Sequence, residues 1–169
     1  PTASRQTPAS AWPQGPGGDA LVWFGRIVPE KAPHLAIEVA QALGRELVIA
    51  GRIGDSDYAD AQILPRLGAG VRWTGPLAPA QLAHLVGSSA VSLSTPAWAE
   101  PFGLVAPEAL MCGTPVVSFA VGGVPEVAHG GVGMELVDAG DVGAMATRAE
   151  ALLARPLTDA AKDVAGNLQ

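Results

Sequence analysis

The chain has 169 residues, a formal net charge of −6, 49% hydrophobic residues and 15% charged residues. This length corresponds to one domain, and this composition excludes an intrinsically disordered chain. The acidic balance provides no positive field for collecting phosphates, so we expect no bulk binding of nucleic acid, and a single cysteine excludes an internal disulfide.

The two ends of the chain differ from its centre. Residues 1–18 are rich in Pro, Gly, Ser, Thr and Ala and lack periodicity, which predicts a linker or a loosely ordered arm. Periodicity also fades over residues 155–169, which we interpret as a peripheral tail of a domain spanning residues 19–154. No apolar run approaches the roughly 20 residues of a membrane-spanning helix, so we expect a cytoplasmic protein. Because the first residue is Pro1, we interpret the chain as processed or as a fragment.

Strand-like and helix-like segments alternate along the rest of the chain. Short apolar runs predict strands over residues 20–25, 46–51, 71–74, 90–94, 115–120 and 134–138. Apolar residues at helical spacing predict helices over residues 31–43, 57–64, 79–86, 104–111 and 142–153, with a short helical turn after 122–126.

Strands made of continuous Val, Ile, Leu and Ala are typical of a parallel sheet that is covered on both faces. We therefore predict a single Rossmann-like, doubly wound α/β domain of about six strands, with helices on both faces of the sheet. In such a sheet, ligands bind outside the carboxyl ends of the strands. The G-x-G-x-x-G fingerprint does not follow the first strand, which argues against NAD or FAD as a ligand.

The loop after the first predicted strand contains two basic residues. Arg26 and Lys31 lie five residues apart around Pro29, and lysine occurs elsewhere only at Lys162. A guanidinium fork and an ammonium group can converge on one diphosphate, although isolated loop cations are more commonly just solvated. Because this pair lies at the end of a strand, we keep two interpretations open: the pair binds a diphosphate, or both side chains are simply solvated.

The loop after the second predicted strand contains the tripeptide Asp55-Ser56-Asp57. In some enzymes, a D-x-D sequence holds a complex of a metal ion and a nucleotide. We favour the simpler interpretation that Asp55 and Ser56 cap the following helix. His34, His84 and His129 are scattered along the chain, so no metal site is expected.

We interpret His34 as a surface residue and Cys112 as a small buried hydrophobe at the end of its helix.

Two glutamates follow the fourth predicted strand. Glu100 precedes the helix predicted over 104–111, and Glu108 lies one turn inside it. Gly103 stands where this helix begins, so the free N–H groups there are open to an anion. Each carboxylate could accept hydrogen bonds from two vicinal sugar hydroxyls, but acidic residues also stabilise helix N-termini in proteins without ligands.

Four sequence blocks, taken together, carry a family resemblance: GRIVPEK (25–31), EPFGLVAPE (100–108), CGTPVV (112–117) and GGVPE (122–126). In order and spacing, residues 20–154 resemble the donor-binding domain of the group 1 (family 4) retaining glycosyltransferases of GT-B fold. The resemblance implies the C-terminal half of that two-domain fold. The family often has Gly after the motif lysine, where this chain has Ala32, which we expect to fit.

The resemblance also implies roles for individual residues. Arg26 and Lys31 would bind the donor diphosphate, Glu108 would hold the ribose hydroxyls, and Glu100 would act beside the reacting carbon of the transferred sugar. Backbone N–H groups would meet the diphosphate and sugar at Phe102, Gly103 and Leu104. The base would lie near Trp73, Thr74 and Gly75.

As implied by the resemblance, the intact enzyme would transfer a hexose-type sugar from a UDP-, GDP- or ADP-type donor without a metal cofactor. The N-terminal acceptor domain is absent from this sequence, so we expect the chain alone to be inactive. A membrane-associated acceptor in the full-length enzyme is left open. Three alternatives also remain open: a non-catalytic nucleotide-sugar-binding module, a UDP-sugar epimerase of the same fold, and a metal-dependent D-x-D transferase.

Overall fold

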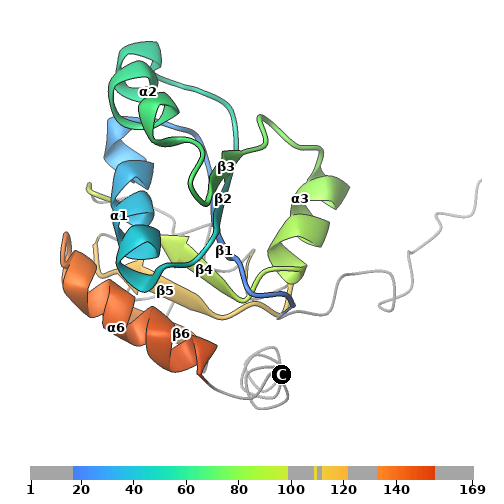
Figure 1. The fold of residues 1–169 in the computed structure, drawn as a ribbon, viewed down its shortest axis with the longest axis vertical. Coiled ribbons are helices and arrows are strands. Elements are labelled where there is room, and N and C mark those ends of the chain that lie inside the picture. The colour runs from blue at the N-terminus through green and yellow to red at the C-terminus, as the bar shows by residue number, and fades with distance from the viewer. Residues whose placement is uncertain (1–16, 99–108, 110–111, 122–132, 155–169) are drawn as a thin grey trace, which may run out of the picture.

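The computed structural model describes residues 17–98, 109, 112–121 and 133–154. Within these residues, six parallel strands form one sheet in the order β3-β2-β1-β4-β5-β6 (Figure 1). This order runs outward from β1 in both directions, as in a doubly wound fold, and it confirms the predicted fold class. The strands are β1 (Leu21–Phe24), β2 (Leu47–Ala50), β3 (Val71–Trp73), β4 (Val91–Ser94), β5 (Val116–Phe119) and β6 (Met134–Val137).

Helices cover both faces of the sheet (Figure 1). On one face lie α1 (Pro33–Leu43), α2 (Ser56–Gln62) and α6 (Val142–Leu153), and α3 (Pro79–Gly87) lies on the other. Two short 3-10 helices, η2 (Pro29–Lys31) and η3 (Leu64–Arg66), precede α1 and follow α2. The helix predicted over 104–111 and the turn predicted after 122–126 lie outside the described residues, apart from Ala109, which is helical.

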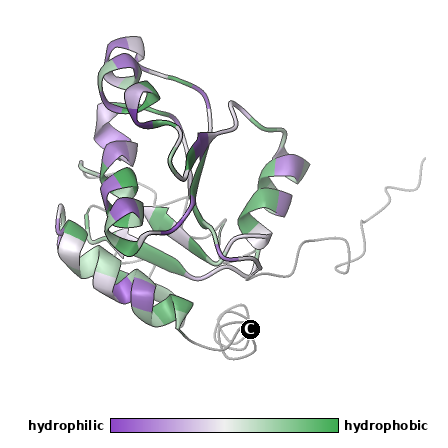
Figure 2. Cartoon of the chain, in the orientation of Figure 1, coloured by the Kyte–Doolittle hydropathy of each residue, from purple (hydrophilic) through white to green (hydrophobic). Residues whose placement is uncertain are grey.

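The strands separate two apolar clusters because alternate side chains point to opposite faces. Leu21, Trp23 and Ile49 pack with α1 and α6 on one face, while Val22 and Phe24 pack with α3 on the other. In Figure 2 the strands are mostly hydrophobic, and the helices carry their hydrophilic residues on their outer sides. Burial of the strands on both faces explains why their sequences are continuously apolar.

Local signals set the helix ends. The side chain of Asp55 accepts a hydrogen bond from the backbone N–H of Tyr58 at 2.9 Å and caps α2, which confirms the capping interpretation of this residue. Asp141 caps α6 in the same way, through the N–H of Ala144 at 2.9 Å. No helix in the described part of the chain is long and apolar enough to cross a membrane.

The first helix begins two residues later than predicted. Ala32 has φ +46° and ψ +51°, a left-handed conformation, and it separates η2 from α1. Non-glycine residues adopt this conformation at a cost of roughly 1–2 kcal/mol. Ala32 is nevertheless buried, so its methyl group is accommodated, and the left-handed geometry explains why glycine would suit this position.

Candidate functional site

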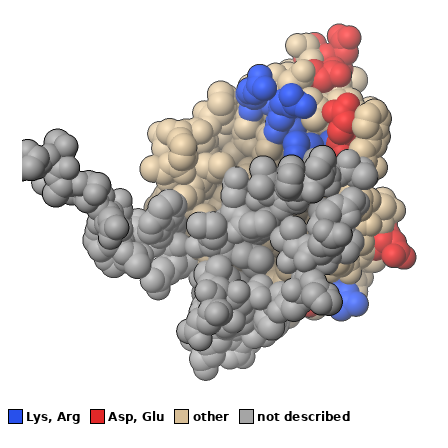
Figure 3. Space-filling view, turned by 180° about the vertical axis from the view of Figure 1, so that it is seen from behind, with Lys and Arg blue, Asp and Glu red and all other residues tan. Residues whose placement is uncertain are grey.

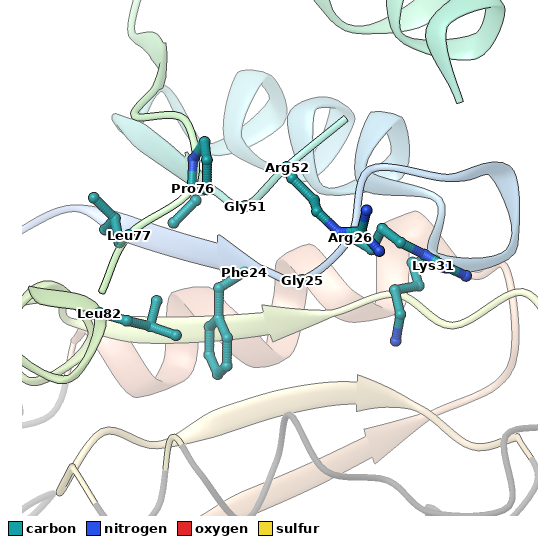
Figure 4. Close-up of a pocket in the computed structure, with 10 residues that line it drawn as sticks. Phe24, Gly25, Arg26, Lys31, Gly51, Arg52, Pro76, Leu77 and Leu82 are labelled. Atoms are coloured by element: carbon teal, nitrogen blue, oxygen red, sulfur yellow. The ribbon is translucent and has the colours of Figure 1, made fainter. Parts of the chain in front are cut away.

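A pocket of about 340 Å³ opens at the carboxyl ends of β1 and β2. Its described lining falls into two parts in Figure 4: Pro76, Leu77, Leu82 and Phe24 lie toward one end, and three basic side chains lie toward the other. The basic side chains are Arg26, Lys31 and Arg52. The structure thus places the predicted Arg26–Lys31 pair in one pocket, and it adds Arg52.

Strand register explains why two arginines meet there. The β1–β2 pairing joins Leu21 to Leu47 and continues beyond both strands to a parallel bridge between Ile27 and Ile53. In this register Arg26 and Arg52 are neighbours. Both isoleucines pack with the cluster on the α1 face. Because side chains alternate between faces, the two arginines point to the pocket side.

The floor of the pocket depends on glycine. A Cβ atom built on Gly51 would lie 1.8 Å from the carbonyl oxygen of Gly25, and Gly51 has φ +142°. Neither the contact nor the dihedral angle admits an L side chain. The Gly51 N–H donates to the carbonyl of Gly75 at 3.1 Å, and its carbonyl accepts from the Trp73 indole at 2.8 Å. These bonds fix the backbone from which Arg52 projects.

The backbone of Lys31 is held from the next strand of the sheet. Thr95, directly after β4, donates from its hydroxyl to the carbonyl of Lys31 at 2.7 Å, with the carbonyl of Ala32 at 3.0 Å. The same hydroxyl accepts from the indole N–H of Trp23 at 2.9 Å. Since Thr95 and Trp23 are both buried, this network joins β1, β4 and the Lys31 loop. Sequence reasoning did not identify Thr95, because its partners lie 63 to 72 residues away.

Charge in the described part of the pocket has one sign, since no Asp or Glu is among the described residues that line it. In the same part of the chain, Arg72 pairs with Glu46 and Arg148 with Glu135, whereas Arg26 and Arg52 pair with no carboxylate. Figure 3 shows Lys and Arg side chains gathered on the described surface, with acidic side chains to one side. The pocket is therefore suited to an anion.

The residues predicted to lie near the base stand beside this pocket and do not line it. Trp73 packs against the apolar cluster on the α1 face. The Thr74 hydroxyl donates to the carbonyl of Gly75 at 2.8 Å. The pocket is lined instead by Pro76 and Leu77, which follow directly. The base position therefore stays a prediction, with these two residues as its nearest apolar surface.

His34 and Tyr58 form a separate pair between α1 and α2. Their Nδ1 and hydroxyl oxygen lie 2.6 Å apart, and the hydroxyl also accepts the His34 backbone N–H at 3.2 Å. His34 is half-buried, so it lies at the surface with part of its side chain covered by Tyr58. Burial lowers the pKa of His34, opposed by the nearby carboxylate of Glu38, and burial raises the pKa of Tyr58 to about 12.

Several predicted site residues lie outside the described part of the chain, namely Glu100, Phe102, Gly103, Leu104 and Glu108. Their predicted roles stay predictions. Cys112 is buried, as predicted. Within the described residues, no group of three or more His, Cys, Asp or Glu side chains could hold a metal ion.

Arg52 is the pocket residue that sequence reasoning missed. A signal for it exists: the tripeptide Gly-Arg-Ile occurs at residues 25–27 and again at 51–53, each directly after a buried strand. When two parallel strands are paired, residues at the same distance beyond the two strand ends lie side by side. The repeated tripeptide therefore predicts adjacent arginines once the strands are paired.

A doubly wound domain with an open, cationic pocket at its strand ends has the form and charge that suit an anionic ligand. Comparison with known protein families identifies the family within this class. The sequence model of the family "Glycosyl transferases group 1" matches residues 12–167, and the chain belongs to this family. The domain corresponds to half of a GT-B glycosyltransferase.

Two kinds of relative illustrate this membership. The chain is 38% identical over 157 residues to a D-inositol 3-phosphate glycosyltransferase of Mycobacterium marinum, covering 88% of this chain and 33% of that protein. It is also similar to AviGT4, a glycosyltransferase involved in avilamycin A biosynthesis, with 28% identity and a TM-score of 0.73, covering 89% of this chain and 47% of that one. A third similar structure is Anabaena Alr3699/HepE in complex with UDP-glucose. It has 27% identity and a TM-score of 0.76, and the match covers 89% of this chain and 42% of that one. The chain spans about a third of the length of the curated relatives it matches.

Proposed function

We propose that this chain is the donor-binding domain of a retaining glycosyltransferase and binds a nucleoside diphosphate sugar at the carboxyl ends of β1 and β2. One observation carries the proposal: Arg26 and Lys31, which the family resemblance assigns to the donor diphosphate, line one open pocket. In the intact protein, the bond between the sugar and the diphosphate would break. A bond to an acceptor hydroxyl would form with the anomeric configuration retained.

The basic end of the pocket suits the charge that develops in this reaction. As the glycosidic bond to the diphosphate lengthens, negative charge gathers on the leaving phosphate. A guanidinium fork from Arg26 and a point charge from Lys31 would stabilise that charge without movement of the protein. Fixed cations at this position are the reason we propose donor binding without a metal ion. Addition of EDTA is expected to leave nucleotide affinity unchanged.

Among donors, we propose a UDP-sugar first, with GDP- and ADP-sugars as the other candidates. The support is the similarity to Alr3699/HepE, whose structure was determined with UDP-glucose. The lining by Pro76, Leu77, Leu82 and Phe24 offers an apolar surface for a base. We place the base at this end of the pocket, next to the predicted segment Trp73–Gly75.

The carboxylates predicted to hold the sugar and ribose remain part of the proposal. Glu100 would contact the transferred sugar beside its reacting carbon, and Glu108 would accept hydrogen bonds from the ribose hydroxyls. Glu108→Ala is therefore expected to weaken binding of UDP. Glu100→Ala should affect UDP-glucose more than UDP, because only the sugar nucleotide carries the contacted hydroxyls. Equal loss of both ligands in both variants would contradict this division.

The proposal is tested by thermal unfolding of the 169-residue chain with UDP, GDP, ADP and their glucose esters. At a ligand concentration about 100 times the Kd, binding adds about 2.7 kcal/mol of stability. For a domain of this size, that corresponds to a rise of roughly 5–10 °C in the unfolding midpoint. At least one of the three nucleotide types should produce such a rise at millimolar concentration. A folded chain that responds to none of them would refute the proposal.

A matched pair of variants locates the binding. Lys31→Gln should reduce the nucleotide-dependent rise to about half, because loss of one of the three basic groups of the pocket is expected to weaken binding about tenfold. Arg45→Gln removes an exposed cation that precedes β2, at the opposite edge of the sheet, and should leave the rise unchanged. Equal effects of the two substitutions would indicate a nonspecific charge effect.

A further inference from the structure

We infer that Arg52 is a third phosphate-binding residue of this pocket and contacts the phosphate attached to the ribose, while Lys31 serves the phosphate attached to the sugar. The inference rests on the proposed function, since it assumes a nucleoside diphosphate in the pocket. It concerns a residue that neither the sequence motifs nor the family resemblance singled out. Three features of the structure lead to it: the strand order, the register of β1 with β2, and the absence of a carboxylate partner among the described residues.

The strand order arranges the pocket residues in a row. Along the carboxyl edge of the sheet, the order β3-β2-β1-β4 brings the segment after β3 first, then Arg52 after β2, then Arg26 after β1. Lys31 comes last, where its carbonyl bonds Thr95 at the end of β4. Figure 4 shows the same sequence of side chains, from Leu77 and Pro76 through Arg52 to Lys31.

This row matches the chemical order of the proposed ligand. A nucleotide sugar runs from an apolar base through ribose and two phosphates to a sugar. With the base against Pro76 and Leu77, the first phosphate from that end reaches Arg52 and the second reaches Arg26 and Lys31. A backbone hydrogen bond links the base end to the segment that carries Arg52: the Gly51 N–H donates to the carbonyl of Gly75, the residue before Pro76, at 3.1 Å.

The register adds an electrostatic reason. Arg26 and Arg52 occupy neighbouring positions just beyond the ends of β1 and β2, in the register that continues to the Ile27–Ile53 bridge, and neighbouring strands lie about 4.8 Å apart. Like charges at neighbouring positions repel each other. Within the described part of the chain no carboxylate pairs with either arginine, although Arg72 and Arg148 each have one. A diphosphate beside the two guanidinium groups relieves this repulsion, because each of its phosphates accepts hydrogen bonds from the nearer arginine.

The stem of Arg26 and the backbone of Arg52 are also held in place by their neighbours. A Cβ atom on Gly54 would lie 2.7 Å from Cγ of Arg26, so the absence of a side chain at Gly54 makes room for Arg26. The carbonyl of Arg52 accepts from the N–H of Ile27 at 2.9 Å. Each arginine therefore projects from backbone that the other strand holds in place.

Titration calorimetry with two probes tests the assignment. UDP carries both phosphates and UMP only the one attached to the ribose. Arg52→Gln should weaken both UDP and UMP by about tenfold each, the loss expected for one charged hydrogen bond. Lys31→Gln should weaken UDP by a similar factor and UMP by less than threefold. Arg45→Gln, which removes an exposed cation outside the pocket lining, should change neither affinity.

Arg52→Gln should also leave the unfolding midpoint of the ligand-free chain unchanged or raised, because it removes one of two repelling charges. Unchanged UMP affinity in this variant would overturn the inference. An equal loss of affinity for uridine would also overturn the inference. Uridine has no phosphate, so this loss would place Arg52 beside the base. If the unsubstituted chain binds none of UDP, GDP and ADP, the proposed function fails instead, and the two failures are thereby distinguished.

Discussion

Replacing Thr95 with Val tests how the fold positions the loop that contains Lys31. The hydroxyl of Thr95 is the acceptor for the Trp23 indole N–H at 2.9 Å and the donor to the Lys31 carbonyl at 2.7 Å. Valine has nearly the same shape and lacks both functions. The indole N–H of Trp23, whose residue is 2% exposed, then has no acceptor in this network. The carbonyl of Lys31, a partly exposed residue, can turn to water.

The cost follows from these two losses. A buried donor without a partner costs about 1–3 kcal/mol, and loss of the second hydrogen bond adds about 1 kcal/mol. We expect Thr95→Val to reduce the free energy of unfolding by about 2–4 kcal/mol. In a domain of this size the unfolding midpoint should fall by roughly 5–15 °C. Urea unfolding monitored by Trp fluorescence measures the first quantity, and calorimetry the second.

Two control variants isolate the hydroxyl. Thr95→Ser keeps it and loses one methyl group, so the loss should stay near 0.8 kcal/mol. Thr147→Val removes an exposed hydroxyl that donates to the Gly143 carbonyl at 3.0 Å within α6, and should change stability by no more than about 0.5 kcal/mol. The Val variant at position 95 should also bind UDP more weakly than the Ser variant. A Val variant as stable as the Ser variant would refute the network.

Three further substitutions have expected outcomes. Gly51→Ala should destabilise the chain strongly, because its Cβ would lie 1.8 Å from the Gly25 carbonyl oxygen. The control Gly44→Ala, at φ +63° with nothing within 4 Å of its Cβ, should cost only about 1–2 kcal/mol. Comparable losses of unfolding free energy in urea would contradict the close approach at Gly51. Asp55→Ala should cost about 1 kcal/mol through loss of the α2 cap, and unchanged nucleotide affinity with and without Mn²⁺ would exclude a metal role for this carboxylate. Burial lowers the pKa of His34 in the folded chain below its usual 6.5, so stability should fall as the pH drops below 6.5 and the unfolded state takes up the proton. His34→Gln should reduce this pH dependence between pH 7 and pH 5, and an unchanged slope would show that another group causes it.

The fold followed from patterns that are local in the sequence. Each predicted strand is a short apolar run, and the structure places a strand within every one of those runs, for example Leu47–Ala50 within 46–51. Asp55 and Asp141 are acidic residues directly before helices and act as caps. Such features depend on neighbours within a few residues, so one sequence suffices to predict them. The start of α1 was placed too early because only the dihedral angles of Ala32 reveal the break.

The joint position of Arg26 and Lys31 in one pocket was predictable for the same reason. Arg26 and Lys31 lie in one short loop, and their convergence could be expected from the sequence. The neighbouring position of Arg52 depends on pairing between strands that lie 26 residues apart in register, from Leu21↔Leu47 to Ile27↔Ile53. The bond from Thr95 to the Lys31 loop spans 64 residues. Contacts of this kind are set by sheet order and register, which composition and periodicity do not specify.

A crystal structure of the chain grown with UDP-glucose tests the central claim most directly. The account predicts the diphosphate at the carboxyl ends of β1 and β2, within hydrogen-bonding distance of Arg26 and Lys31, with the base toward Pro76 and Leu77. A nucleotide bound elsewhere on the domain, or in this pocket with its phosphates turned away from both basic residues, would contradict it.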